Sequence, residues 1–408
     1  MRRRLLAALG LIGLAGVLAL LGLLRPWATY NPIKLNTMFA EDQRVAHFRA
    51  MEGLMPYRVV DAADRPFQFD AAPAAIVDQY SYAGETRRLD DFLTRVDATG
   101  LLVIQDDRIV HEQYRLGASE TTRHTSWSVA KSFVATLVGV ALREGRIASL
   151  DDPMDRYAPS LTGSVYEGVP IRHVLEMSSG IDFDETYNSR RSDIQMLFVK
   201  LFAFRQRLTA VLHDYDRARP SGSHFHYASI ETQALGQLLS ELYDQPLSKL
   251  LEDKLWQPLG MAGQAYWNTD RMGEQGMELA FCCLNAQLRD YAKLGRLYLQ
   301  QGQWQGRALL PDGWVPMATT PPRQDMQPGQ SDYAYGPRGY GLHWWIPADA
   351  QREYFAAGVW GQYIYVSEPD RLIIVRSSVD PAYRANMDES IVVFRAIRDG
   401  LRAAATAD

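Results

Sequence analysis

Residues 128–143 read Ser-Val-Ala-Lys-Ser-Phe-Val-Ala-Thr-Leu-Val-Gly-Val-Ala-Leu-Arg, and they are the most informative part of the chain. Their apolar side chains are almost continuous and would cover every face of a helix, which is typical of a helix buried inside a protein. Gly145 lies just beyond and can cap the end of this helix. Lys131 stands inside the apolar run, where a solvated lysine is not expected, so it needs a partner or a chemical purpose.

Ser128 and Lys131 are spaced so that, on a helix, their side chains lie one turn apart on the same face. A serine hydroxyl becomes a good nucleophile when a neighbouring base takes its proton, and a lysine whose pKa is lowered by burial can share that task. A serine at a helix N-terminus also places backbone N–H groups near developing negative charge. The bare pattern is common, and a capping serine beside a surface lysine is the alternative. The apolar surroundings of Lys131 favour the catalytic interpretation.

Two further segments are candidates for the same chemistry. The sequence Tyr-Ala-Ser at 227–229 follows a turn at 220–223 and precedes an apolar helix. Its phenol could exchange a proton if a nearby lysine lowered the tyrosine pKa, or the tyrosine could be an ordinary core residue. The sequence Gly-Val-Trp-Gly-Gln at 358–362 begins an expected strand. Its glycines could let backbone N–H groups face a ligand, or they could form a plain turn.

Strands are expected near both ends of the chain, with helices between them. Apolar residues at 101–104 and 109–114 surround a polar Asp106-Asp107 turn, which predicts a hairpin. Residues 146–345 look mainly helical. The other expected elements are helices at 230–243, 286–301 and 387–404 and strands at 353–356, 362–367 and 372–377. The simplest architecture is an α+β fold, in which an antiparallel sheet from both ends of the chain is flanked by helices and carries an inserted, mainly helical lobe.

The N-terminus is expected to direct export. Three arginines at 2–4 precede residues 5–24, which are uncharged and rich in Leu, Ala and Gly. A helix of this length spans about 30 Å, the thickness of the hydrocarbon core of a membrane. We therefore predict an N-terminal transmembrane helix that anchors the protein in the inner membrane, with the catalytic domain on the periplasmic side. A signal that is cleaved before secretion is the alternative.

Composition argues against several other classes of function. The net charge of −5 and the lack of a basic patch give no reason to expect a nucleic-acid partner. Cys282 and Cys283 are the two cysteines of the chain, and neighbouring cysteines rarely bridge, so we expect two small buried side chains and no disulfide framework. His224 and His226 have no evident third ligand, so a metal site is not expected. The chain contains no Gly-x-Ser-x-Gly motif and no nucleotide-binding glycine motif.

The order of these motifs resembles that of the penicillin-recognising serine hydrolases: Ser-x-x-Lys on a buried helix, Tyr-x-Ser about 100 residues later, and a glycine-bearing strand near the end. Other segments resemble the branch that contains class C β-lactamases, bacterial esterases and 6-aminohexanoate-dimer hydrolases. They are Asp-Pro-Met-Asp-Arg-Tyr at 152–157, Met-Ser-Ser-Gly-Ile-Asp at 177–182, Pro-Leu-Gly-Met at 258–261, Leu-Asn-Ala at 284–286 before Arg289-Asp290, and Tyr-Gly-Leu-His-Trp-Trp at 340–345. The likeness covers roughly residues 86–400 and implies a β-lactamase/DD-peptidase-like fold.

The resemblance implies a role for each motif and needs no cofactor. Ser128 would be the nucleophile that forms an acyl-enzyme, Lys131 its partner and Tyr227 the catalytic tyrosine. The backbone N–H groups of Ser128 and Val359 would form the oxyanion hole. The remaining substrate-binding candidates are Ser229, where β-lactamases usually have Asn, together with Gly358, Trp360 and Tyr187.

The third motif departs from the Lys-Thr-Gly of the β-lactamases, because residues 356–358 are Ala-Ala-Gly. In that family the lysine helps to hold the carboxylate of β-lactams and peptidoglycan peptides. Its absence favours a small-molecule ester or amide as substrate, as in the 6-aminohexanoate-dimer hydrolase and esterase members. A β-lactamase or peptidoglycan DD-peptidase and a non-catalytic cell-envelope scaffold of the same fold are the alternatives.

We therefore expect three parts along the chain. Residues 1–30 would form the membrane anchor or signal, and residues 31–85 a tether and N-terminal extension that wraps the domain. Residues 86–405 would form the serine hydrolase domain. Its sheet would come from residues 86–124 and 346–405, and its helical lobe from residues 125–345.

Overall fold

The computed structural model describes residues 2–330 and 337–407. Strands from the two ends of the chain pair with each other, because β5 (Ala98–Gln105) lies antiparallel to β16 (Leu372–Ser378). β5 also forms the expected hairpin with β6 (Arg108–Tyr114). Asp106 and Asp107 in its turn both have positive φ angles, as tight hairpin turns require. The sheet predicted from both chain ends is therefore confirmed.

The main sheet extends to both sides of this central pair. Its strand order is β12-β13-β14-β15-β16-β5-β6-β2, and its pairs are antiparallel except for the short edge strand β2, which runs parallel to β6. The remaining strands are β12 (Gly339–Tyr340), β13 (Trp345–Ile346), β14 (Glu353–Gly358), β15 (Gln362–Ser367) and β2 (Asp70–Ala71). The strands β14 and β15 occur where the apolar sequence predicts them.

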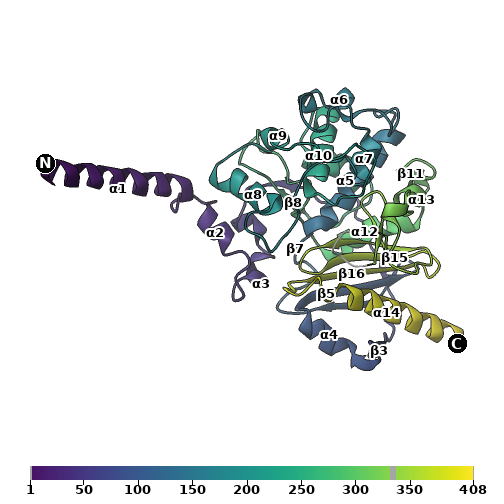
Figure 1. Ribbon diagram of the computed structural model, residues 1–408. Helices are drawn as coiled ribbons and strands as arrows, with labels where there is room; N and C mark the ends of the chain where they lie inside the picture. Colours follow the sequence, from purple (N-terminus) through teal and green to yellow (C-terminus); the bar gives the residue numbers. More distant parts are fainter. Residues whose placement is uncertain (1, 331–336, 408) are drawn as a thin grey trace.

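Helices cover both faces of this sheet (Figure 1). The helices on one face are α14 (Met387–Ala407) and α4 (Leu89–Arg95), and α12 (Leu288–Leu299) lies on the other. Successive side chains alternate between the two faces: Ile373 packs in the cluster that includes α12, and Ile374 in the cluster that includes α14. A Cβ on Gly295 would come within 2.9 Å of Ile373, so the missing side chain lets α12 lie close to the sheet.

The inserted lobe is built around α5 (Ala130–Arg143) and α10 (Ser229–Tyr243), which pack against each other. α5 is buried from Ala130 to Ala141, as its apolar sequence predicts. The shorter helices are α6 (Met154–Tyr157), α7 (Ile171–Leu175), α8 (Asp193–Phe198), α9 (Leu208–Val211), α11 (Leu247–Leu251), α13 (Trp314–Ala318) and the π-helices η4 (Val199–Ala203) and η5 (Glu252–Trp256). Single turns of 3₁₀-helix occur at η1 (Met51–Gly53), η3 (Pro159–Leu161) and η6 (Gln324–Met326).

The lobe also contains a small sheet that the sequence did not indicate. Its strand order is β1-β8-β9-β7, with β1 (Tyr57–Val60), β8 (Ala265–Asn268), β9 (Leu284–Ala286) and β7 (His124–Thr125). Because β9 pairs with both β7 and β8, the residues at 284–286 are extended and α12 begins at Leu288, later than the sequence predicts. A separate short hairpin joins β10 (Gln303–Trp304) and β11 (Arg307–Ala308).

Residues 31–88 are connected to both parts of the molecule. α2 (Pro32–Asn36) and α3 (Arg44–His47) lead to β1, which pairs with β8 of the lobe. β2 then pairs with β6 of the main sheet, and the hairpin of β3 (Gln79–Tyr82) and β4 (Glu85–Arg88) packs against α14. The backbone pairing makes this stretch part of both sheets.

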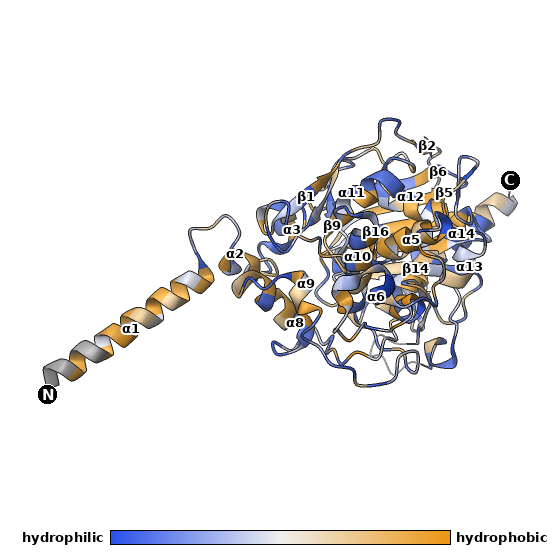
Figure 2. Ribbon diagram, turned by 90° about the horizontal axis from the view of Figure 1, so that it is seen from above, coloured by the Kyte–Doolittle hydropathy of each residue, from blue (hydrophilic) through white to orange (hydrophobic). Residues whose placement is uncertain are grey.

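The chain begins with α1 (Arg2–Leu24), which projects away from the rest of the molecule in both views and is mostly hydrophobic (Figures 1 and 2). The sequence predicts a membrane-spanning helix here. Within the described residues, however, no helix is found that has both the length and the apolar character needed to cross a membrane. The predicted transmembrane anchor is therefore not supported.

Candidate active site

Ser128 lies where the small sheet of the lobe leads into α5. It is in the 3₁₀ turn η2 (Trp127–Val129), and the α-helix starts two residues later, at Ala130. The sequence predicts that the helix begins at Ser128, whereas the structure has a tighter 3₁₀ turn before the α-helix begins. Trp127 has a φ of +42°, a left-handed conformation that is uncommon for a bulky residue. Such backbone strain is concentrated at functional sites.

Lys131 is buried and directed at the serine. Its Nζ lies 2.8 Å from Ser128 Oγ and 3.0 Å from the carbonyl oxygen of Phe281. Burial lowers the pKa of Lys131 to about 7, and the nearby charge of Glu185 acts in the opposite direction. A substantial fraction of this amine is therefore neutral near pH 7 and can accept a proton from the hydroxyl.

Tyr227 lies beside the same amine, just before α10. The Lys131 Nζ is 5.2 Å from the centre of the tyrosine ring. The ring stacks on Trp345 at a centroid distance of 5.4 Å, and the residue is only 4% exposed. Tyr227 and Ser128 line one narrow pocket together with Tyr187, Gly358 and Val359. The three residues predicted from separate motifs are thus brought together.

Gly358 is the last residue of β14 and is pressed against the turn that carries Ser128. A Cβ at this position would lie 2.5 Å from the carbonyl oxygen of Ser126 and 3.1 Å from the backbone nitrogen of Ser128. Since real Cβ atoms do not approach backbone so closely, the position requires glycine. This contact places the backbone of Val359 next to the turn that carries Ser128.

Trp360 does not line the narrow pocket but helps to hold the turn that follows β14. Its φ is +64°, and its ring stacks on Phe39 of the N-terminal extension at 5.4 Å. Phe39 also stacks on Trp127, and Phe48 contacts both tryptophans edge-on. Phe39 and Phe48 of the extension thus form an aromatic clamp on Trp127 and Trp360, the two residues near Ser128 that have positive φ angles.

Ser229 and Tyr187 share a partner that the sequence did not reveal. The Ser229 hydroxyl and backbone N–H donate to the Glu185 carboxylate at 2.6 and 2.8 Å, and the Tyr187 hydroxyl donates to it at 2.6 Å. Ser229 is buried, and this hydrogen bond occupies its side chain. Glu185 is 6% exposed and joins the 182–188 loop to the start of α10. Nothing in its neighbouring sequence marks it, because its partner Ser229 is 44 residues away.

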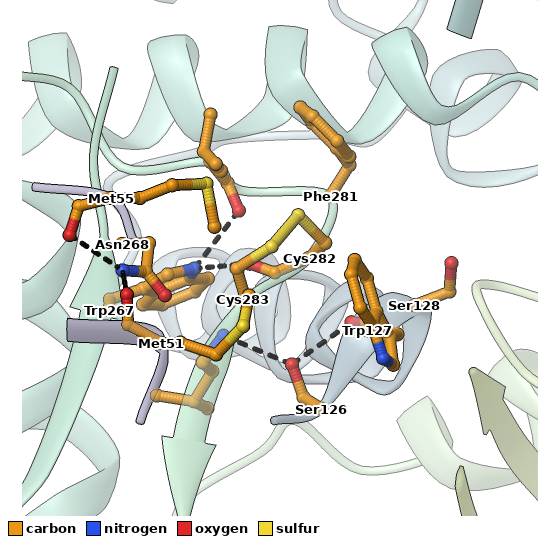
Figure 3. Close-up of a disulfide and its surroundings, with 12 residues drawn as sticks. Met51, Met55, Ser126, Trp127, Ser128, Trp267, Asn268, Phe281, Cys282 and Cys283 are labelled. Atoms are coloured by element: carbon orange, nitrogen blue, oxygen red, sulfur yellow. Dashed lines mark hydrogen bonds between the residues drawn. A yellow bond between two sulfur atoms is a disulfide. The ribbon is translucent and has the colours of Figure 1, made fainter. Parts of the chain in front are cut away.

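Cys282 and Cys283 form a vicinal disulfide, so the prediction that they remain separate is wrong (Figure 3). Cys283 has a φ of +67°, which is a left-handed backbone conformation. Nothing in the neighbouring sequence predicts this conformation. Trp267 Nε1 donates to the Cys282 carbonyl at 2.7 Å, which holds the segment in place. Both cysteines are buried as expected. The residue before them is Phe281, whose carbonyl binds Lys131.

In the described part of the chain, no group of three His, Cys, Asp or Glu side chains is placed to hold an ion. His226 Nε2 instead pairs with the carbonyl of Phe183 at 2.7 Å. The chemistry available at the site is that of a hydroxyl, an amine, a phenol and backbone N–H groups.

A serine, a buried lysine at hydrogen-bonding distance and an adjacent tyrosine are the arrangement of the Ser-x-x-Lys serine hydrolases. The sequence model of the Beta-lactamase family matches residues 86–382, and the chain belongs to this family. The protein is a serine hydrolase with the β-lactamase fold. The resemblance drawn from the motifs is thereby confirmed.

Individual relatives agree with this assignment. The chain is 27% identical over 304 residues to a 6-aminohexanoate-dimer hydrolase from Paenarthrobacter ureafaciens, and the match covers 72% of this chain and 76% of the relative. A Bacillus anthracis structure assigned as a 6-aminohexanoate-dimer hydrolase has a TM-score of 0.78 at 20% identity and covers 89% of this chain and 95% of its own. A penicillin binding protein from Bacillus halodurans has a TM-score of 0.58 at 16% identity, covering 75% and 100%.

Proposed function

We propose that the protein hydrolyses a small-molecule ester or amide through an acyl intermediate on Ser128. The observation that carries this proposal is the 2.8 Å contact between Ser128 Oγ and a lysine whose pKa is lowered to about 7. A lysine with a purely structural role is not expected at this position, because burying a charged amine costs free energy unless the charge is paired. The 27% identity to a 6-aminohexanoate-dimer hydrolase also supports the hydrolysis of an amide or ester bond.

In the proposed mechanism, Ser128 Oγ attacks the substrate carbonyl carbon while Lys131 accepts the hydroxyl proton. The N–H groups of Ser128 and Val359 stabilise the tetrahedral oxyanion, a contribution of about 3 kcal/mol for each donor in comparable sites. The C–O or C–N bond then breaks, and Tyr227 together with Lys131 returns the proton to the leaving oxygen or nitrogen. Water, deprotonated by the same groups, cleaves the acyl-serine and regenerates the free hydroxyl.

The strand β14 argues against β-lactams and peptidoglycan peptides as main substrates. Ala356 occupies the position of the lysine that helps to hold the substrate carboxylate in the β-lactamases, and it is a buried, uncharged residue of the sheet. A substrate carboxylate bound at this place would have no lysine to pair with, and burying an unpaired carboxylate costs free energy.

The test compares the full-length protein with Ser128→Ala and with Ser132→Ala. Ser132 is a matched control, since it lies on the same helix and its hydroxyl donates to the His343 carbonyl, away from the nucleophile. We expect Ser128→Ala to lower p-nitrophenyl acetate turnover by at least a thousandfold and to lose labelling by a fluorophosphonate probe. Ser132→Ala should keep the label. Equal labelling of Ser128→Ala would refute the proposal, and faster turnover of nitrocefin than of esters would favour a β-lactamase.

We also propose that the catalytic domain works outside the cytoplasm, whether the N-terminal segment is retained or cleaved. Three arginines before the uncharged residues 5–24 form an export pattern. The Cys282–Cys283 bond supports this assignment, since disulfides persist mainly in oxidising compartments. An alkaline phosphatase fused after residue 408 should be active in bacterial cells, and an expressed but inactive fusion would contradict export.

A further inference from the structure

Ser128 also borders a second and much larger cavity, of about 490 Å³. It lies between residues 24–39, which run from the end of α1 into the N-terminal extension, and the lobe segment 194–203. Its volume is in the range of pockets that enclose small organic ligands. Ser128, Tyr187 and Val359 line both this cavity and the narrow pocket, so the nucleophile stands at the boundary between the two.

The lining of this larger cavity is apolar. The side chains that the extension and the lobe direct into it are mainly aliphatic or aromatic, and none of the described lining residues carries a charge. They include Ile33, Met38, Phe39, Ile194, Phe198 and Ala203. Cys282 of the vicinal disulfide lines the same space next to Phe281, and Figure 3 shows this pair close to Trp127 and Ser128. Such a surface favours hydrocarbon and disfavours an unpaired charge.

The position of Tyr227 decides which half of the substrate enters which space. Tyr227 lines the narrow pocket with Trp345 and does not line the large cavity. The group that returns the proton must contact the departing oxygen or nitrogen. The leaving group therefore faces the narrow pocket, and the acyl group extends from Ser128 to the opposite side, into the apolar cavity.

The lobe side of this cavity has a local backbone irregularity. The segment Val199–Ala203 is a π-helix that directly continues α8, and π-helical turns are frequent at functional sites. Gln195 Nε2 donates to the Tyr187 carbonyl at 3.0 Å. This hydrogen bond connects α8 to the 182–188 loop, which lies beside Ser128. The cavity wall is thus connected to the catalytic residues.

We propose that the large cavity is an acyl-binding site and that the protein acts on esters or amides of uncharged, medium- to long-chain acyl groups. This inference rests on the proposed function of Ser128 and adds the substrate class. It differs from an aminohexanoyl substrate, whose terminal amine would meet no carboxylate among the described residues of the cavity lining.

The test is a series of p-nitrophenyl esters from acetate to dodecanoate, in which the leaving group is constant. We expect kcat/KM to rise by roughly fourfold for each added methylene until the cavity is filled. Ala203→Phe, which places a ring in the cavity, should lower the ratio of decanoate to acetate kcat/KM by at least tenfold. Ala210→Phe, at an exposed position of α9 outside the cavity lining, is the matched control and should leave that ratio unchanged.

A second measurement separates this inference from the proposed function. Decanamide binding to Ser128→Ala, followed by calorimetry, does not depend on turnover and should be weakened at least tenfold by adding Ala203→Phe. Ser128-dependent ester turnover with no chain-length preference and no decanamide binding would overturn the acyl site and leave the hydrolase proposal intact. Decanamide binding without any Ser128-dependent turnover would overturn the hydrolase proposal.

Discussion

At the scale of single residues, the site depends on one amine whose proton affinity is set by burial. Lys131 is buried, its Nζ lies 5.2 Å from the centre of the Tyr227 ring and 5.9 Å from that of Phe281, and it donates to the Ser128 hydroxyl and the Phe281 carbonyl. Both partners are neutral, so neither repays the cost of burying a full charge. Glu185 is the charged group that acts on Lys131, and it only partly opposes the effect of burial.

The first prediction concerns pH. Protonated Lys131 cannot accept the Ser128 proton, so kcat/KM of the wild type should fall as pH decreases through about 7 and reach a plateau above it. Lys131→Met should lower kcat/KM by about a thousandfold and remove this acid limb. Lys254→Met, which affects a surface ion pair with Glu144, should keep the wild-type profile. A wild-type profile that is flat between pH 5.5 and 8.5 would show that Lys131 is not the base.

The same amine also contributes to folding stability in a pH-dependent way. Its folded pKa is about 7, below the ordinary value of 10.5, so the unfolded chain binds more protons between these two values. The contribution of Lys131 to stability therefore rises as pH increases from about 7 to 10.5.

At the scale of elements, the contact between the end of β14 and the turn η2 positions the chemistry. Gly358 allows the strand to touch Ser126 and Ser128, and the clamp of Phe39 and Phe48 holds the adjoining tryptophans. Two elements that are more than 200 residues apart in sequence thus form one surface around Ser128.

The second prediction tests this contact. Gly358→Ala places a methyl group 2.5 Å from the Ser126 carbonyl and forces the nucleophile turn or the strand to move. We expect a destabilisation of about 1–3 kcal/mol and a loss of about a hundredfold in kcat, because small displacements of a nucleophile have large effects on rate. Gly53→Ala, at an exposed glycine with no neighbour within 4 Å, should change neither quantity measurably. Unchanged kcat in Gly358→Ala would mean that the close approach has no catalytic role.

At the scale of the whole molecule, the vicinal disulfide is expected to matter little for global stability. A cross-link stabilises mainly by closing a loop of the unfolded chain, and adjacent residues enclose almost none, so the expected contribution is about 1 kcal/mol. Protein refolded under reducing conditions should therefore unfold within about 3 °C of the oxidised form in calorimetry. A decrease of more than 10 °C would show that the bond supports the fold as a whole.

The sequence predicted those helices and strands whose pattern of apolar and polar residues is contained within the element itself. The continuous apolar run of α5, the Asp106-Asp107 hairpin and the strands β14 to β16 are all recognisable from neighbouring residues. The small sheet of β1, β8, β9 and β7 was not predicted, because its strands are short and come from distant parts of the chain. Their extended conformation depends on pairing partners that only the folded molecule supplies.

The candidate site shows the same division. Ser128, Lys131 and Tyr227 could be named from the sequence because spacing on a buried helix and the order of motifs mark them. Glu185, the clamp by Phe39 and the Cys282–Cys283 bond could not be named in this way. Each depends on a distant contact or on a left-handed backbone conformation rather than on neighbouring residues.

The amino-acid sequence was therefore sufficient to predict the fold class, from the strands expected near both ends of the chain, and to name Ser128, Lys131 and Tyr227 as candidate catalytic residues, through the family resemblance that the order of the motifs carries. The three-dimensional arrangement decided the pKa of Lys131, the approach of Gly358 and the size and polarity of the cavity beside Ser128. These properties depend on which surfaces are buried together, and burial is a property of the whole folded chain.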